Sequence, residues 1–267
     1  MNTVRMAVAD GITMAKRNTI KLVRVPDLLG SVVLTPIMFV LLFAYVFGNM
    51  IEIPGVPYRE FMLPGVFTQT AIFGAALSGY MLVGDLQKGI IDRLRTLPMA
   101  SSAVLIGRTT SDLLINLLSL VMMVAMGLIV GWRVHTSPLE AALGCLLLLL
   151  FAYVLSWAAT LVALIIRTPE VFNNVSSMAI FPLVFLANTF IDTTRLAPPL
   201  QVVAEWNPVS AFTQAARELF GNTNPAVSMP DAWPLQHAVP ASLLWAAVML
   251  AAFIPLATWR YNKAVSR

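Results

Sequence analysis

The fold is decided by residues 141–166, which read AALGCLLLLLFAYVLSWAATLVALII. This stretch contains no Asp, Glu, Lys or Arg. An α-helix rises about 1.5 Å per residue, so about 20 residues cross a hydrocarbon core of about 30 Å. Backbone N–H and C=O groups find no water partners in that core, and a helix satisfies them internally. Residues 141–166 are therefore predicted to cross a membrane as a helix.

Five other stretches of about twenty residues or more also lack Asp, Glu, Lys and Arg. They are residues 28–47, 61–83, 113–132, 171–191 and 239–259. The whole chain of 267 residues is 58% hydrophobic and 11% charged, whereas soluble domains carry about 25% charged residues. These features predict an all-α polytopic membrane protein, with six transmembrane helices forming one domain over residues 1–267.

The basic residues predict the orientation of these helices. Thirteen of the 17 Lys and Arg residues fall in the N-terminal segment, in residues 84–112, at Arg167 and in the C-terminal tail. The other four are Arg59, Arg133, Arg195 and Arg217. Lys and Arg accumulate on the cytoplasmic side of membrane proteins. Both termini are therefore expected in the cytoplasm, for a multi-pass protein of the inner or plasma membrane.

The N-terminal segment, residues 3–24, has the pattern of an amphipathic helix. Val4, Val8 and Ile12 share one face at 100° per residue, while Arg17 and Lys21 lie on the opposite face. This pattern predicts an interfacial helix in contact with membrane lipids. A solvated helix packed on a partner protein is the alternative.

The connection from residue 84 to residue 112 contains a second short amphipathic segment. Ile90, Leu94 and Leu97 share one helical face, with Leu86 one turn earlier, and Pro98 ends the pattern. A short cytoplasmic helix over residues 85–97, with an apolar stripe among mixed charges, suits docking into a groove of another protein. The alternative is a linker helix that packs on its own bundle.

The long connection over residues 192–238 is expected on the outer side. Asn207 as N-cap, Pro208 at the first position and Gly221 as the stop predict a helix over residues 209–220. A short apolar run, residues 200–204, precedes it. The two helices form either a re-entrant hairpin or a flat external cap, and the pattern is compatible with both.

Several kinds of chemistry have no motif in this sequence. The chain lacks G-x-x-x-x-G-K-[ST], so no phosphate-binding loop of its own is expected. His135, His237 and the single Cys145 are isolated, so no metal site is predicted. The basic residues flank the predicted spans and do not form a nucleic-acid surface. No predicted span carries an ionisable group near its middle, which argues against a proton- or sodium-coupled carrier.

Uncharged polar residues inside the spans are the candidates for a substrate pathway. Phe67, Gln69, Thr70 and Phe73 cluster in residues 61–83, and Asn188 lies in residues 171–191. Gln69 and Phe73 are four positions apart and share a helical face, so this pair is the first choice. The alternative role for such residues is hydrogen bonding between helices.

Residues 84–108 and 199–219 resemble type-2 ABC exporter permeases, and the most similar branch is the daunorubicin-resistance type. Lys88-Gly89-Ile90-Ile91-Asp92-Arg93-Leu94, followed by Thr96-Leu97-Pro98 and Gly107-Arg108, is similar to the cytoplasmic coupling helix of that family. Asn207-Pro208 and Ala216-Arg217-Glu218-Leu219 are similar to the segment before its last helix. The sequence departs from the family where Leu and Gln follow Asp85, because an Arg-Glu pair is common there.

The resemblance implies two permease copies, identical or paralogous, flanked by two ABC ATPase subunits that hold ATP and Mg²⁺. This chain would then be no enzyme and would carry no cofactor, and its substrate would be a lipophilic drug, lipid or glycolipid. A secondary transporter or channel without an ATPase, and a membrane-anchoring subunit without a pathway, are the alternatives. The implied ATPase interface consists of the N-terminal helix and Asp85, Lys88, Gly89, Ile90, Asp92, Arg93, Leu94 and Leu97.

Overall fold

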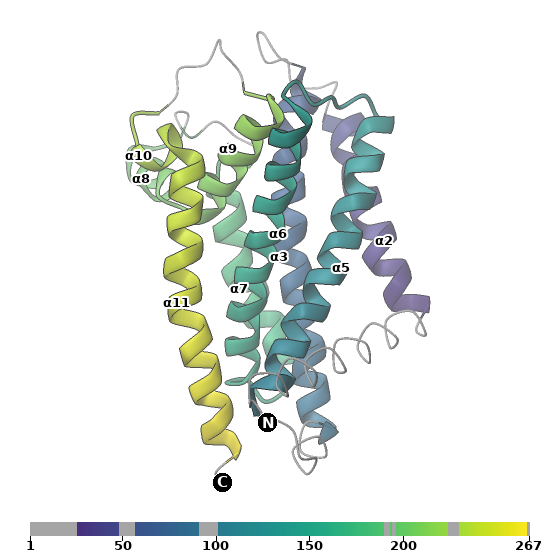
Figure 1. Ribbon diagram of the computed structural model, residues 1–267, viewed down its shortest axis with the longest axis vertical. Helices are drawn as coiled ribbons and strands as arrows, with labels where there is room; N and C mark the ends of the chain where they lie inside the picture. Colours follow the sequence, from purple (N-terminus) through teal and green to yellow (C-terminus); the bar gives the residue numbers. More distant parts are fainter. Residues whose placement is uncertain are drawn as a thin grey trace.

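The computed structural model describes residues 26–47, 57–90, 101–189, 193, 196–223 and 230–265, and within these ranges the elements are helices. This confirms the all-α class. The predicted helix at residues 3–24, and Asp92, Arg93, Leu94 and Leu97, lie outside the described residues. The elements, shown in Figure 1, are α2 (Pro26–Leu41), the π-helix η1 (Leu42–Phe47), α3 (Tyr58–Gln87), α5 (Ser101–Ile129), α6 (Pro138–Ala163), α7 (Pro169–Phe185), α8 (Pro198–Glu205), α9 (Pro208–Phe220), α10 (Trp233–Gln236) and α11 (Ala238–Val265).

Four of the described helices are long and apolar enough to cross a membrane. They are Tyr58–Gln87, Leu105–Ile129, Pro138–Ala163 and Ala238–Lys263, which belong to α3, α5, α6 and α11. Their lengths of 25 to 30 residues exceed the need of a bilayer core. α7 has 17 residues and ends at Phe185, although the apolar run continues to residue 191. Residues 186–189 form a turn instead of continuing the helix. They carry no charge and remain within the apolar run, so hydropathy alone does not show where the helix ends.

Helix α3 is the centre of the bundle and contacts α2, α5, α6, α7 and α9. Two of its glycines allow close approach of neighbouring elements. A Cβ atom at Gly65 would lie 2.6 Å from the Thr189 carbonyl oxygen, and one at Gly79 would collide with the Phe172 ring. Both positions therefore require a residue without a side chain, and they set how closely the α7 segment packs on α3.

Helix α9 begins and ends as its sequence predicts. The Asn207 side chain accepts a hydrogen bond from the Val209 N–H, Pro208 is the first helical residue, and Gly221 ends the helix in a left-handed conformation with φ of 71°. α9 packs against α3, α6 and α11, and most of its residues are buried. Figure 1 shows α8, α9 and α10 together at the end of the bundle opposite the C-terminus.

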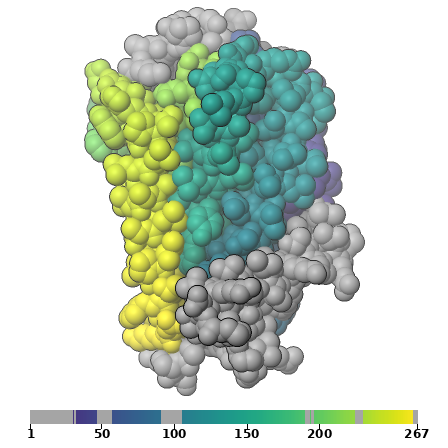
Figure 2. Space-filling model, in the orientation of Figure 1, coloured from purple at the N-terminus to yellow at the C-terminus, as the bar shows by residue number. Residues whose placement is uncertain are grey.

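The outward faces of α5 and α11 are covered with apolar side chains. Leu117 and Val121 on α5, and Leu244 and Val248 on α11, are all more than two-fifths exposed. In Figure 2, α11 forms one side of the molecule along most of its height. Apolar surface of this extent is unusual on a soluble protein and is what lipid-facing helices present.

The region between α3 and α5 differs from its prediction in two respects. Asp85 to Gln87 form the last turn of α3, and the chain turns at Lys88 and Gly89, where Gly89 has a φ of 66°. Asp85 to Gln87 therefore continue α3 and do not begin a separate docking helix. Helix α5 begins at Ser101, twelve residues before the predicted start of that span. Arg108 and Asp112, assigned by sequence to the connection, therefore belong to a long helix of the bundle.

Candidate functional site

A line of polar and small residues runs between α3 and α5. Ser78, Gly74 and Thr70 follow one another at intervals of four along α3, and Asp112 and Asn116 have the same spacing on α5. Residues four apart lie on one helical face. The two faces meet closely, since a Cβ at Gly74 would lie 2.5 Å from the Asn116 Oδ1. The line is thus an interface between two long helices that contains polar groups.

An ion cluster forms the end of this line nearer the C-terminal end of α3. The Arg108 Nη1 lies 3.4 Å from the Asp85 Oδ2, and its Nε lies 3.5 Å from the Asp112 Oδ1. Arg108 also donates to the Ser78 carbonyl oxygen at 2.6 Å and to the Ser78 hydroxyl at 3.4 Å. The side chains of Arg108, Asp85 and Asp112 are 8%, 13% and 2% exposed. One buried guanidinium therefore serves two carboxylates.

The sequence placed Arg108 and Asp112 in the connection before the third predicted span, and the structure corrects this placement. Arg108 and Asp112 are buried against α3, inside the segment Leu105–Ile129 that is long enough to cross a membrane. A signal was present in the sequence. Arg108, Asp112, Asn116 and Ser119 follow the spacing of one helical face, which indicates a polar stripe turned toward neighbouring helices rather than a loop. Ser119 continues the stripe to α2, where its hydroxyl donates to the Val32 carbonyl oxygen at 3.2 Å.

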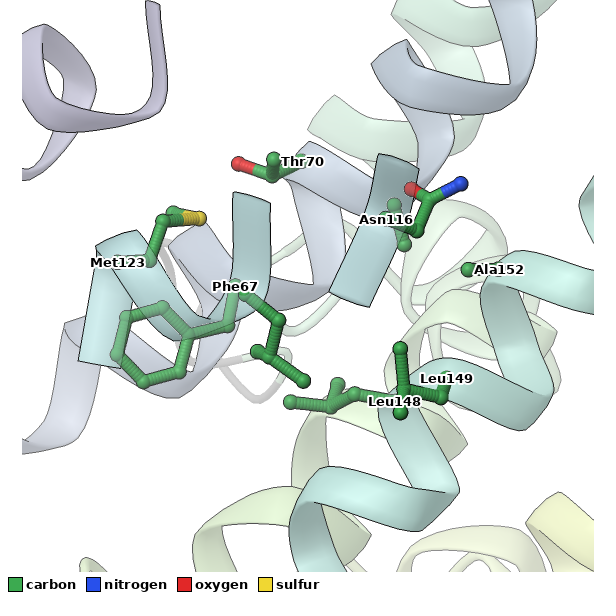
Figure 3. A pocket seen from close by; sticks show the side chains of 9 residues that line it. Phe67, Thr70, Asn116, Met123, Leu148, Leu149 and Ala152 are labelled. Atoms are coloured by element: carbon green, nitrogen blue, oxygen red, sulfur yellow. The ribbon is translucent and has the colours of Figure 1, made fainter. Parts of the chain in front are cut away.

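Two small pockets lie along the line, on either side of Asn116. The first, with a cavity volume of about 10 Å³, lies between α3, α5 and α6 (Figure 3). Phe67 and Thr70 of α3 and Asn116 and Met123 of α5 line it, opposite leucines of α6. The second, also with a cavity volume of about 10 Å³, lies between α2, α3 and α5 and includes Asp112. Asn116 lines both pockets.

The structure separates the predicted pathway residues. Phe67 and Thr70 line the first pocket, whereas Gln69 and Phe73 line neither pocket. Gln69 is buried, and Phe73 is 39% exposed with its ring 6.0 Å from that of Phe39 on α2. The preferred pair, Gln69 and Phe73, therefore lies outside the pockets.

Asn188, the fifth predicted pathway residue, lies at the junction of α7 and α9. Its backbone N–H donates to the Ser210 hydroxyl at 2.8 Å, and its side-chain amide donates to Gln214 at 3.3 Å. Both partners belong to α9. Asn188 thus attaches α9 to the end of α7, which is the alternative role for polar residues in membrane helices.

An aromatic cluster joins the first pocket to the end of the bundle that holds α9. The Phe67 ring packs edge-on against Trp132 at 5.3 Å, and Trp132 packs edge-on against Phe220 at 5.2 Å. The Trp132 indole N–H donates to Asn222 at 2.8 Å. Aromatic pairs in this arrangement contribute about 0.5–1.5 kcal/mol beyond their buried area. Phe67 is thus held by the same contacts that hold the end of α9.

Arg217 anchors α9 to α3 and to the end of α7. Its guanidinium carbon lies 3.8 Å from the centroid of the Phe61 ring. Its Nε donates to the Phe61 carbonyl oxygen at 2.8 Å, and its Nη2 donates to the Thr189 carbonyl oxygen at 3.0 Å. The side chain is almost fully buried. A planar cation that stacks on a ring while donating in two directions is a role that lysine cannot reproduce.

Arg217→Lys is therefore expected to lower the melting temperature of the purified protein. The variant keeps the charge but loses the stacking and one hydrogen bond, at a cost of about 1–3 kcal/mol. Thermal unfolding in detergent measures the effect. Arg133→Lys is the matched control, because Arg133 also donates to backbone carbonyl oxygens but from an exposed position. Equal melting temperatures for the two variants would contradict the anchoring role of Arg217.

The described residues contain no group of three His, Cys, Asp or Glu side chains that could hold a metal ion. The two histidines have other contacts. The His135 Nε2 lies 2.8 Å from the Glu60 carboxylate, and the His237 ring stacks on Trp233.

An apolar helical bundle with several helices long enough to cross a membrane defines the class of this molecule as a multi-pass membrane protein. The comparison with known families identifies it more closely. The profile of the ABC-2 type transporter family matches residues 11–220, so the chain belongs to that family. This confirms the resemblance found in the coupling segment and in the segment before the last helix.

Individual relatives are drug-resistance and transport permeases. The daunorubicin resistance ABC transporter permease protein DrrB1 of Streptomyces coeruleorubidus is 32% identical over 198 residues, which are 74% of this chain and 70% of that protein. The doxorubicin resistance ABC transporter permease protein DrrB of Mycobacterium tuberculosis is 28% identical over 176 residues, 66% of this chain and 61% of that protein. The putative transport permease ycf38 of Pyropia yezoensis is 26% identical over 207 residues, 75% of this chain and 70% of that protein. These relatives are named as permeases, not enzymes.

Proposed function

We propose that this chain is the transmembrane subunit of an ATP-driven exporter, with ATP and Mg²⁺ bound by a separate ABC ATPase. Membership of the ABC-2 type transporter family carries the proposal. The sequence of 267 residues supports it, because it contains no phosphate-binding loop that could hold ATP on this chain. The ATPase interface is proposed at Asp85, Lys88, Gly89 and Ile90 together with the expected docking residues at 92–97.

We propose six spans over the whole chain, with α2 and α7 joining the four long helices. The 16 residues of α2 continue into the six of η1, and the 17 residues of α7 extend about 25 Å. Because α9 is buried among α3, α6 and α11, a re-entrant hairpin of α8 and α9 is favoured over a flat external cap. Such a hairpin would fill the outer leaflet where α7 stops.

A second copy of the permease is proposed to cover α7. Asn173 and Asn174 are exposed on this helix beside Val175 and Met178. Exposed amides are unfavourable in hydrocarbon, because lipid offers no hydrogen-bond partners. A dimer that shares an aqueous pathway along this face supplies those partners. The proposed substrate is a lipophilic drug or a lipid, in keeping with the drug-resistance names of two relatives.

Copurification tests the proposed function. The tagged chain is extracted from its native membranes in mild detergent, and bound proteins are identified by mass spectrometry and assayed for ATP hydrolysis. We expect an ABC ATPase in about equal amounts, with ATP hydrolysis that requires Mg²⁺. A chain that purifies without any ATPase, yet still transports, would support the alternative of a secondary transporter or channel.

The proposed orientation predicts a pattern of cysteine labelling. In a protein with Cys145 replaced by Ala, Ser101→Cys at the start of α5 is expected to be protected from an impermeant maleimide in intact cells. Asp231→Cys, an exposed position beside α10 at the other end of the bundle, is expected to react. The opposite pattern would place the termini outside the cell and would remove the coupling segment from the cytoplasm.

A further inference from the structure

The polar face of α9 is buried against α3 and against the turn that follows α7. Arg217 donates to the carbonyl oxygens of Phe61 on α3 and Thr189 in the turn. About one helical turn earlier on α9, Gln214 accepts a hydrogen bond from the Asn188 side chain at 3.3 Å. The three elements therefore meet at a junction that is held by hydrogen bonds inside an otherwise apolar bundle.

Three side-chain oxygens at this junction have no hydrogen-bond partner among the described residues. They are the Gln69 Oε1 of α3, the Thr189 Oγ1 of the turn and the Thr213 Oγ1 of α9. The three residues are 7%, 0% and 0% exposed, so bulk solvent does not supply the missing hydrogen bonds. A polar atom that is buried without a partner destabilises the folded state. Three such atoms at one junction indicate a bound partner that is not a protein side chain.

Helix α9 ends beside the start of α3, and this fixes the relative direction of the two helices. The His135 backbone N–H donates to the Phe220 carbonyl oxygen at 2.9 Å, and the His135 Nε2 lies 2.8 Å from the Glu60 carboxylate. Phe220 is the last residue of α9, and Glu60 lies in the first turn of α3. Residues therefore lead away from this end of the bundle as their numbers rise along α3 and as they fall along α9.

Helical spacing then places the three oxygens on the same side of the junction. A Cβ atom at Gly65 would lie 3.0 Å from the Thr189 Cγ2, and Gln69 is one turn beyond Gly65 on the same face of α3. Arg217 reaches the Thr189 carbonyl oxygen at 3.0 Å, and Thr213 is one turn beyond Arg217 on the same face of α9. Gln69 and Thr213 thus both lie on the inner side of Thr189.

Water fits this site better than a cation does. The Gln69 Oε1 only accepts hydrogen bonds, and a water molecule can donate to it while it accepts from a threonine hydroxyl. Neutral oxygens also bind Na⁺ in membrane proteins. The Arg217 guanidinium, however, is bonded to Thr189 at the same junction, and its positive charge repels a second cation.

We propose that ordered water binds between Gln69, Thr189 and Thr213 and joins α3 to α9. A buried water typically makes about three hydrogen bonds to polar groups that lack other partners. Water-mediated bonds are nearly as favourable in enthalpy as direct ones. Helix α9 is then attached to the bundle partly through water. This inference is independent of the proposed export function, because it concerns only how α9 is held.

Melting temperatures of the purified permease test the inference. Gln69→Leu and Thr213→Val each remove one group that bonds the water, and each is expected to lower the melting temperature. Once one substitution is present, the other is expected to have at most about half of its effect on the wild type, because the shared water is already lost. Gln69 Oε1 and Thr213 Oγ1 make no hydrogen bond to each other, so a direct contact does not explain such coupling.

Thr109→Val is the matched control. Thr109 is as buried as Thr213, but its hydroxyl donates to the carbonyl oxygens of Leu105 and Ile106 at 3.1 Å. Its effect is expected to add to that of Gln69→Leu. Additive effects of Gln69→Leu and Thr213→Val would overturn the proposal.

Two further measurements keep the test decisive. The wild-type melting temperature is expected to be the same in NaCl and in KCl at equal ionic strength, and a rise in NaCl alone would identify a sodium site instead. If either variant cannot be purified, a cryo-EM map of the wild type, at a resolution that shows ordered water, replaces the cycle. A density peak within hydrogen-bond distance of the Gln69 Oε1 is expected, and a map without that peak would overturn the proposal.

Discussion

Arg108→Leu is expected to abolish the recovery of folded protein from membranes. The substitution leaves the carboxylates of Asp85 and Asp112 buried without their shared cation. Removing one partner of a buried ion pair costs about 3–5 kcal/mol, and here two acids lose the same partner. That loss is comparable to the whole stability of many domains. Size-exclusion chromatography of the detergent extract measures the folded fraction.

Two companion variants separate loss of the ion cluster from a general effect of removing arginine. Arg133→Leu removes an exposed arginine that follows the other end of α5 and is expected to give normal yields. Replacing Asp85 and Asp112 by Asn in the Arg108→Leu protein removes all three charges and is expected to restore much of the folded fraction. Wild-type yield and melting temperature for Arg108→Leu alone would show that the cluster does not stabilise the bundle.

Leu94→Asp is expected to abolish association with the ATPase while leaving membrane insertion intact. Leu94 lies on the apolar stripe of the expected docking helix, and a charge placed there would be buried unpaired in the partner's groove. Such burial costs several kcal/mol, enough to reduce association by at least about a hundredfold. The ratio of ATPase to permease after copurification measures the effect.

Thr96→Asp is the control for this variant. It adds the same charge two positions away, on the other side of the expected helix. We expect this variant to copurify with normal amounts of ATPase. If Leu94→Asp retained the ATPase as well, the segment at residues 85–97 would pack elsewhere, and the interface would have to involve other cytoplasmic residues.

Local signals in the sequence were sufficient for some elements of the fold. The limits of α9 follow from Asn207, Pro208 and Gly221, whose effects depend on neighbouring backbone groups alone. The long apolar runs likewise predict α3, α6 and α11, because the length of a run sets the length of a membrane helix. These features need no knowledge of which helices lie side by side.

The features that the sequence reading missed depend on contacts between distant residues. The charges of Arg108 and Asp112 argued for a loop, yet they are buried because Asp85 and Ser78 of α3 lie opposite them. The hydrogen-bond partners of Asn188 are on α9, more than twenty residues later, so the sequence could not name them. Gln69 and Phe73 share a helical face. The packing of the bundle decides which helices that face contacts.

ATP-driven transport is the most direct test of the central claim. The permease and the ATPase that copurifies with it are reconstituted in liposomes, and accumulation of a fluorescent lipophilic drug inside the vesicles is followed. We predict accumulation with Mg²⁺ and ATP, and none with a non-hydrolysable ATP analogue or with a proton or sodium gradient alone. Accumulation driven by an ion gradient without ATP would contradict the account and identify the chain as a secondary transporter.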